Sequence, residues 1–208
     1  MADPNDLNSV FTQIYLEKRW GWHNMTARKN TKFYSGGGTD PDNDTAGAYI
    51  KLLQSFIAQT GISTVVEIGC GDWEISNQID WGSADYTGYD VFEAGIAYNV
   101  EHFSRPGVRF VCADAILETE IQADFLIVKD VFQHLPPSYC KDFVKAIPRR
   151  FRHNLITNDL GGNTEIEFGG YSGNDFSAHP FFMRSQLLLQ WNQKSPAAGN
   201  KQTITLLP

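Results

Sequence analysis

Polar side chains that could bind a ligand recur where short apolar runs of this chain end. The first run closes on Glu67-Ile-Gly69-Cys-Gly71, and glycines at such a place are typical of a tight turn where the backbone approaches a ligand. Asp90 follows about 20 residues later, which is the spacing of an acid that binds ribose hydroxyls. Asp114, at the end of a later run, could accept a hydrogen bond from an adenine amino group. The pattern predicts a nucleoside-containing ligand.

The charge of the turn narrows the choice of ligand. A turn that binds pyrophosphate would carry Gly-x-Gly-x-x-Gly, whereas Asp72-Trp73 follows Gly71 here and Ser76 is a poor substitute for the missing glycine. Glu67 and Asp72 would repel a pyrophosphate, but they suit a ligand that carries an ammonium or sulfonium group. Charge therefore favours S-adenosylmethionine over a dinucleotide.

A histidine close to another strand end could carry catalysis. His134 stands in Asp130-Val-Phe-Gln-His134-Leu-Pro, and a neutral imidazole near pH 7 can remove a proton from an attacking hydroxyl or amine. The same histidine could instead pack and hydrogen-bond behind the site, and Asp130 could simply cap its turn. Both alternatives stay open at this point. Asn158 and Asp159, at the end of a fifth run, are expected on the substrate side.

The elements that must position these residues alternate along the chain. Apolar, β-branched runs predict strands at 62–68, 86–90, 108–112, 123–129 and 154–157. Apolar spacing predicts helices at 7–19, from Asp44 or Thr45 to Gly61, at 94–103 and at 138–151, and a short helix fits after Trp73. Pro148 argues that the last helix stops early or bends. This alternation is typical of a parallel α/β sheet, and two final runs, 186–191 and 202–207, should pair as an antiparallel hairpin.

Composition sets the domain organisation and limits the partners. The 208 residues are 42% hydrophobic, which fits one domain, 44–208, preceded by an N-terminal segment, 1–43, that we expect to form a flap or lid. The net charge of −7 disfavours nucleic acid and anionic membranes as partners. No apolar run approaches the roughly 20 residues of a membrane span.

Cysteine and histidine usage bears on the compartment and on metals. Three widely spaced cysteines indicate a reducing compartment, so we expect a cytoplasmic protein. No grouping of His, Cys and Asp has the spacing of metal ligands, so we expect a reaction that needs no metal. The oligomeric state is left open.

Four motifs and the closing hairpin carry a resemblance to a known family. The motifs are Val-Val-Glu67-Ile-Gly-Cys-Gly-Asp72, Tyr-Asp90, Ala-Asp114 and Lys-Asp130-Val-Phe-Gln-His-Leu-Pro. Together they resemble the class I S-adenosylmethionine-dependent methyltransferases. The resemblance implies an α/β fold, a Rossmann-like three-layer sandwich with a seven-stranded, mostly parallel sheet whose last strand is antiparallel and inserted beside the fifth.

A narrower resemblance, to a small and poorly characterised group of such enzymes, covers nearly the whole chain. Its marks are Trp20-Gly21, Ser35-Gly-Gly-Gly38, Gly69-Cys-Gly-Asp72, Asp130–Leu135, Asn163-Thr-Glu-Ile166 with Gly169, and Pro180-Phe181. The turn departs from the class at Trp73, where a third glycine is usual. We expect Trp73 to shape the pocket or to begin the next helix.

The resemblance also implies roles for individual residues. Gly69 and Gly71 would let the backbone approach the methionine part of the cofactor, and Asp130 would stand where the class places the residue that faces the transferred methyl. The residues expected to bind S-adenosylmethionine are Tyr34, Gly37, Glu67, Gly69, Cys70, Gly71, Asp90, Val91, Asp114, Ala115, Lys129 and Asp130. Those expected to contact the substrate are Trp20, Trp22, His23, Gln133, Asn158 and Asp159. The expected catalytic residues are His134 and Asp130.

These expectations converge on an S-adenosylmethionine-dependent methyltransferase that acts on a small molecule, because the short chain leaves little room for a large substrate domain. Two alternatives belong to other classes. One is a methyltransferase-like binding module without catalysis, since the cofactor acids could persist without an acceptor site. The other is an NAD(P)-dependent oxidoreductase, against which the acidic turn and the missing third glycine count.

Overall fold

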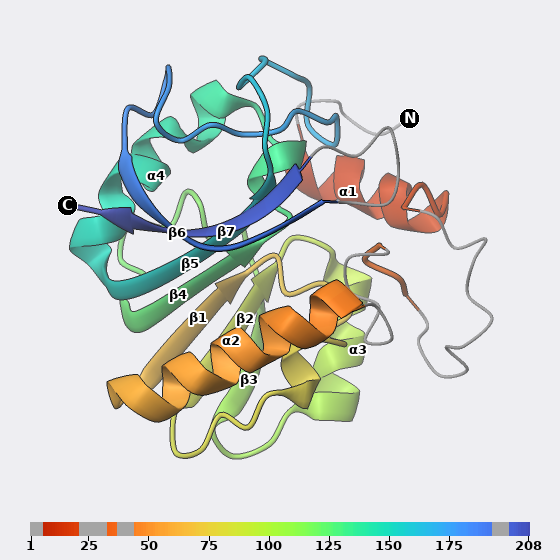
Figure 1. The fold of residues 1–208 in the computed structure, drawn as a ribbon. Helices are drawn as coiled ribbons and strands as arrows, with labels where there is room; N and C mark the ends of the chain where they lie inside the picture. The colour runs from red at the N-terminus through yellow and green to blue at the C-terminus, as the bar shows by residue number, and fades with distance from the viewer. Residues whose placement is uncertain (1–5, 21–32, 37–43, 193–199) are drawn as a thin grey trace.

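The computed structural model describes residues 6–20, 33–36, 44–192 and 200–208, and its centre is one seven-stranded sheet (Figure 1). The strand order is β3-β2-β1-β4-β5-β7-β6. Strands β1 to β5 pair in parallel, and β7 runs antiparallel to both of its neighbours, β5 and β6. This confirms the predicted mostly parallel sheet with an antiparallel strand inserted beside the fifth. The strands are β1 (Thr64–Ile68), β2 (Asp85–Asp90), β3 (Val108–Cys112), β4 (Ala123–Lys129), β5 (Phe151–Asp159), β6 (Arg184–Asn192) and β7 (Asn200–Leu207).

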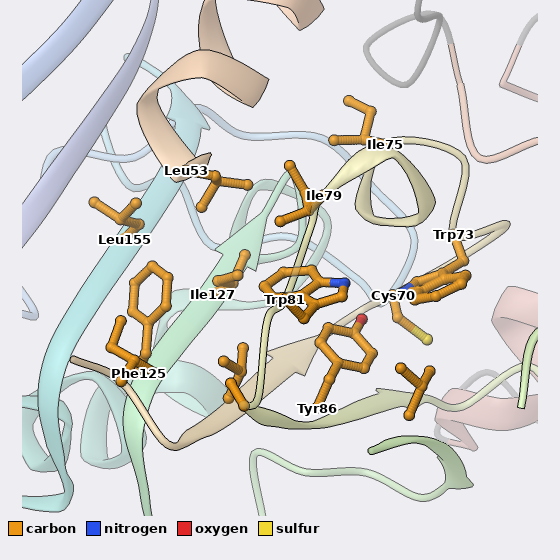
Figure 2. Packing of buried hydrophobic residues seen from close by; sticks show 14 of the residues in the cluster. Leu53, Cys70, Trp73, Ile75, Ile79, Trp81, Tyr86, Phe125, Ile127 and Leu155 are labelled. Atoms are coloured by element: carbon orange, nitrogen blue, oxygen red, sulfur yellow. The ribbon is translucent and has the colours of Figure 1, made fainter. Parts of the chain in front are cut away.

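Helices cover both faces of the sheet, as the parallel strands require. Successive side chains of the buried centre of β4 point to opposite faces. Phe125 and Ile127 face α2 (Asp44–Thr60), within the cluster drawn in Figure 2, and α3 (Glu93–Phe103) adds Ile96 to the same cluster. Leu126 and Val128 pack in a second cluster with α4 (Pro137–Arg150). The predicted three-layer sandwich is confirmed.

The first helix is shorter than its apolar pattern predicts. The pattern predicts a helix over 7–19, but α1 (Leu7–Leu16) ends three residues earlier, in a turn at Lys18, whose φ is 56°. The Arg19 N–H donates to the Ile14 carbonyl and the Lys18 N–H to the Tyr15 carbonyl, each at 3.2 Å. This pair of bonds is a Schellman motif, which usually has glycine at the left-handed position. A lysine there gives the sequence no stop signal.

Two other elements differ from their predicted forms. The short helix expected after Trp73 is a 3-10 helix, Ser76–Gln78, and the Trp81 indole donates to the Ser76 carbonyl at 3.1 Å. In the C-terminal half, α4 runs past Pro148 to Arg150, and β5 begins at the next residue. The predicted strand at 154–157 is therefore the buried centre of a longer strand.

This topology brings the ends of distant strands to one edge of the sheet. The carboxyl ends of β1, β2, β4 and β5 meet there, and the antiparallel β7 places its first residues beside the end of β5. In Figure 1, α1 lies beyond this edge. Within the described parts of the chain, no helix is both long enough and apolar enough to cross a membrane.

Candidate functional site

A cavity of about 290 Å³ opens at this edge of the sheet and collects most of the predicted site residues. Its volume lies near the lower end of the ~300–1,000 Å³ that is typical of small-molecule pockets. The predicted residues that line it are Trp20, Glu67, Gly69, Cys70, Gly71, Asp90, Val91, Asp114, Ala115, Lys129, Asp130, Gln133, His134 and Asp159. The strand ends therefore form one site, as the sequence predicts.

The glycine turn at the end of β1 is required by the packing of the protein itself. Gly69 and Gly71 have φ of 72° and 53°, which side chains rarely adopt. A Cβ at Gly69 would lie 2.3 Å from Val131 Cγ2, and one at Gly71 would lie 2.3 Å from Ser35 Oγ. The side chain of Asn99 in α3 donates to the Gly71 carbonyl at 2.8 Å. The turn is thus held in one shape before any ligand enters.

Glu67, the last acid before the turn, is buried under it. Its Oε2 accepts hydrogen bonds from the Ser76 hydroxyl, at 2.7 Å, and from the Tyr86 hydroxyl. Burial raises the pKa of Glu67 to about 7, although both hydroxyls favour the charged form. A cation bound in the cavity would stabilise the ionised carboxylate.

Asp90, at the end of β2, is held ready to accept further hydrogen bonds. Its Oδ2 accepts from the Gly71 N–H and its Oδ1 from the Phe92 N–H, both at 3.0 Å. Burial raises the pKa of Asp90 despite these bonds. Each carboxylate oxygen accepts one N–H and can accept another donor, so the side chain fits a pair of vicinal hydroxyls.

Asp114, at the end of the loop after β3, is more fully engaged. Its Oδ1 accepts the Ile116 N–H at 3.1 Å, and its Oδ2 accepts the Tyr139 hydroxyl. The carboxylate therefore caps the following turn and also lines the cavity. The sequence predicts Asp114 beside an adenine. The same carboxylate would then cap the turn and contact the adenine.

Four charged side chains meet at the ends of β4, β5 and β7. Lys129 and Lys201 both donate to the carboxylate of Asp130, and Lys201 Nζ lies 3.6 Å from Asp159 Oδ1. Burial alone would raise the pKa of Asp130, but the two ammonium groups outweigh it and hold that pKa well below its usual range. Asp130 is therefore a carboxylate near neutral pH and a poor proton acceptor. Its φ of 58° is strained, which is common at functional sites.

His134 has one ring nitrogen fixed and the other turned to an amide. Nδ1 lies 2.9 Å from the Gly170 carbonyl, which can only accept, so Nδ1 carries the proton. Gln133 Oε1 accepts the Asp159 N–H at 3.0 Å, so its NH₂ group is the one that lies 3.4 Å from His134 Nε2. Both contacts select the neutral imidazole, and burial lowers the pKa of His134 as well. Nε2 therefore keeps its lone pair.

Residues near the N-terminus cover the cavity. Phe11 and Tyr15 of α1 line it, and Tyr15 stacks on Phe92 with ring centroids 4.2 Å apart. Ser35 and Asp72 exchange two hydrogen bonds: the Ser35 N–H donates to Asp72 Oδ2 at 2.9 Å, and the Asp72 N–H donates to Ser35 Oγ at 2.8 Å. These bonds attach the described piece 33–36 directly to the glycine turn.

The remaining predicted residues are placed as follows. Tyr34 and Asn158 are buried but are not among the residues that line the cavity. Trp22, His23 and Gly37 lie outside the described residues. Trp73 lines the cavity and is almost fully buried in the aromatic cluster of Figure 2, so it shapes the pocket wall and does not begin an α-helix.

Sequence reasoning missed several residues of the site. Lys201 lines the cavity, yet it stands one residue before the predicted last strand and is delivered only by the pairing of β7 with β5. Phe11 and Tyr15 carry a helical signal but no ligand signal. Ser76, judged a poor substitute for glycine, has the separate task of binding Glu67. The sequence does offer one clue to Lys201. It is a lysine directly before the last predicted strand, which the resemblance inserts beside the fifth strand, at the site.

Metal chemistry has no visible support in the described ranges. Across residues 6–20, 33–36, 44–192 and 200–208, no group of three or more His, Cys, Asp or Glu side chains could hold a metal ion. Independence from metals remains an expectation.

Comparisons with known proteins were made at three levels. No family model matches the chain, and no curated protein matches its sequence. Solved structures match it at low identity. The 1,6-didemethyltoxoflavin-N1-methyltransferase of Burkholderia thailandensis, bound to 1,6-didemethyltoxoflavin and S-adenosylhomocysteine, is 17% identical with a TM-score of 0.62, over 99% of this chain and 90% of that one.

Two further structures agree with it. The magnesium protoporphyrin IX methyltransferase of Synechocystis, with bound S-adenosylmethionine, is 10% identical over 98% of both chains, with a TM-score of 0.61. The N-methyltransferase NodS of Bradyrhizobium japonicum is 12% identical over 79% of this chain and 97% of that one, with a TM-score of 0.56. The chain therefore has the fold of the class I S-adenosylmethionine-dependent methyltransferases.

Proposed function

We propose that this chain is an S-adenosylmethionine-dependent methyltransferase that acts on a small-molecule acceptor. The observation that carries the proposal is the geometry of Asp90 beside the glycine turn. Its two carboxylate oxygens are oriented by the Gly71 and Phe92 N–H groups at the end of β2. A carboxylate held in this way, at the wall of a cavity, matches the two hydroxyls of a ribose.

The charge at this end of the cavity supports a cationic cofactor over a dinucleotide. Glu67, Asp90 and Asp114 line it, and the hydrogen bonds described above tie them to hydroxyls and backbone N–H groups. A pyrophosphate placed beside these acids would be repelled, whereas an ammonium or sulfonium group would be attracted. Burial raises the pKa of Glu67, and a cation bound beside it would lower that pKa again.

His134 is our candidate for the general base. When bound, S-adenosylmethionine supplies a methyl group that its sulfonium already activates, so the protein mainly aligns the acceptor and receives its proton. His134 Nε2 has the lone pair for this, because Nδ1 donates to the Gly170 carbonyl. Such help is typically worth ~10²–10⁴-fold. If Nε2 plays no part in turnover, His134 serves only to join the 133–134 turn to the loop at Gly170.

Asp130 has a different role from His134. Two lysines hold it as a carboxylate, so it orients charge near the acceptor and does not take a proton. Its neighbours Gln133 and Asp159 line the same part of the cavity. We place the acceptor there, between the strand ends and the residues of α1.

A small-molecule acceptor is favoured by the size of the cavity. The structural neighbours include enzymes whose acceptors are a toxoflavin precursor and a magnesium porphyrin. We propose a small-molecule acceptor for this chain too, without nucleic acid or membrane as partner. The segment 1–43 is proposed as the lid of the site, since six of its described residues line the cavity: Leu7, Phe11, Tyr15, Trp20, Ser35 and Gly36.

Parallel titrations test the proposal and separate its rivals. S-adenosylmethionine, S-adenosylhomocysteine and NAD are each titrated calorimetrically into the protein. Binding of the first two and not of NAD is expected, whereas preference for NAD would establish the oxidoreductase alternative. Labelled methyl transfer to a metabolite extract then distinguishes an enzyme from a binding module, because a module would bind the cofactor and label nothing.

A further inference from the structure

Lys201 reaches the cavity through the strand that breaks the parallel order of the sheet. It is the second residue of β7, and the antiparallel register sets it opposite Asp159 at the end of β5. Its side chain is 8% exposed, yet it is among the residues that line the cavity. A nearly buried ammonium group therefore borders the space we assign to the acceptor.

The hydrogen bonds of Lys201 are incomplete within the described residues. An ammonium group has three N–H donors. One engages Asp130 Oδ1, while Asp159 Oδ1, at 3.6 Å, lies beyond the usual N–H···O range of 2.7–3.2 Å. Because a buried charge is costly unless it is fully hydrogen-bonded, the remaining donors favour an oxygen supplied by a ligand.

The second oxygens of the two carboxylates beside Lys201 have other donors. The second oxygen of Asp130 accepts from Lys129, and the second oxygen of Asp159 accepts the Tyr171 hydroxyl at 2.7 Å. The two lysines and two aspartates balance each other. A ligand carboxylate or phenolate on Lys201 would add one negative charge near the place proposed for the sulfonium, and the two charges would attract each other.

Another part of the cavity lining is aromatic. Trp20 and His134 both line the cavity with ring centroids 5.5 Å apart, and Phe11 lies 6.0 Å from Trp20 by the same measure. Aromatic walls suit a planar ligand that stacks or packs edge to face. His134 Nε2, which also lies 3.4 Å from the Gln133 NH₂ group, adds one acceptor to this part of the lining.

Building on the proposed function, we infer that Lys201 selects the methyl acceptor, and that the acceptor is a planar aromatic compound with a carboxylate or phenolate oxygen. That oxygen accepts a hydrogen bond from Lys201 Nζ. The hydroxyl or N–H that becomes methylated lies next to it on the ring and faces His134. Lys201 is therefore a binding residue for the acceptor and contributes nothing to the affinity for the cofactor.

The experiment compares aromatic acids with their uncharged counterparts. The protein saturated with S-adenosylhomocysteine is titrated with a matched set of aromatic acids and their primary alcohols, salicylate and 2-hydroxybenzyl alcohol among them. Ligand-observed NMR measures the affinities. At least one acid should bind about tenfold or more tightly than its alcohol, because a charge-assisted hydrogen bond is at stake.

Three variants locate the effect at Lys201. The double variant Lys201→Met/Asp159→Asn removes one charge of each sign, so that Lys129 and Asp130 remain balanced, and it should lose the preference for acids. Lys201→Arg should keep most of it. Lys145→Met, at an exposed position on α4, is the matched control and should change nothing. S-adenosylhomocysteine affinity should stay within about twofold in all three.

Two outcomes would overturn the inference. One is a wild-type protein that binds no acid more tightly than its alcohol, a result that needs no folded variant. The other is a double variant that keeps the preference. Failure of S-adenosylhomocysteine to bind the wild type would overturn the proposed function and this inference with it, whereas cofactor binding without acid preference would overturn this inference alone.

Discussion

Replacing Asp90 with asparagine separates the two functions of this carboxylate. In the structure both oxygens accept backbone N–H groups at 3.0 Å, from Gly71 and from Phe92. An asparagine has one acceptor oxygen, so one N–H would face the amide NH₂ group and lose its partner. An unpaired buried N–H costs ~1–3 kcal/mol. Burial disfavours the charged form of Asp90 and raises its pKa. Removal of the charge therefore offsets part of the cost of the unpaired N–H.

The expected fall in stability is therefore about 1 kcal/mol, the lower end of this range. For a chain of this size such a loss lowers the melting temperature by ~2–4 °C. The loss of affinity should be larger. A ribose hydroxyl that donates to a carboxylate contributes ~1.5–3 kcal/mol, so removal of one such bond weakens cofactor binding roughly 10- to 150-fold.

Calorimetry with S-adenosylhomocysteine and a thermal melt measure the two effects on the same samples. Asp142→Asn is the matched control, since Asp142 is an exposed acid on α4, away from the cavity lining. It should change neither quantity. A D90N protein that melts as expected but binds S-adenosylhomocysteine within twofold of the wild type would refute the ribose assignment of Asp90.

Three other predictions concern the buried acid, the covering segment and the histidine. Burial raises the pKa of Glu67 from 4.5 to about 7, so the free protein should lose stability as pH rises from about 4.5 to 7. Glu67→Gln should remove up to about 3 kcal/mol of that loss in the free energy of unfolding, since one pKa unit corresponds to 1.36 kcal/mol. Chemical denaturation at about pH 4.5 and at about pH 7 measures the difference. Ser35→Ala removes the two hydrogen bonds of the Ser35 hydroxyl, one with the Asp72 N–H and one with the Tyr15 hydroxyl, each ~0.5–1.5 kcal/mol, and keeps the backbone Ser35 N–H bond to Asp72. Amide exchange in α1 and 33–36 should accelerate, and equal exchange would contradict the contact. Nitrogen NMR should find His134 with its proton on Nδ1 and a pKa below 6.5, and His134→Ala should keep cofactor affinity but slow methyl transfer by ~10²–10⁴-fold.

The sequence predicts the parts of the site that depend on local pattern. Asp90 and Asp130 each end an apolar run, and the carboxyl ends of parallel strands meet at one edge of the sheet. Knowledge of where the strands end is then enough to bring these acids together. Their exact partners do not follow from the pattern. Nothing local shows that Asp130 bonds to two lysines or that Asp114 also caps a turn.

The residues that were missed reach the site through long-range pairing. Lys201 depends on the register of β7 against β5, which sets it opposite Asp159. Ser35 depends on a contact with Asp72 that no periodicity predicts. The type of the short helix after Trp73 does not follow from the pattern either: it is a 3-10 helix, and the Trp81 indole donates to its Ser76 carbonyl. The Schellman motif at Lys18 is different, since it is local but lacks the glycine that would mark it.

A crystal structure with S-adenosylhomocysteine tests the central claim most directly. The account predicts both ribose hydroxyls within hydrogen-bond distance of the Asp90 carboxylate, the methionine part along the turn at Gly69 and Gly71, and the sulfur directed toward Asp130 and His134. Density for the ligand with its ribose away from Asp90, or its sulfur away from the end of β4, would contradict it.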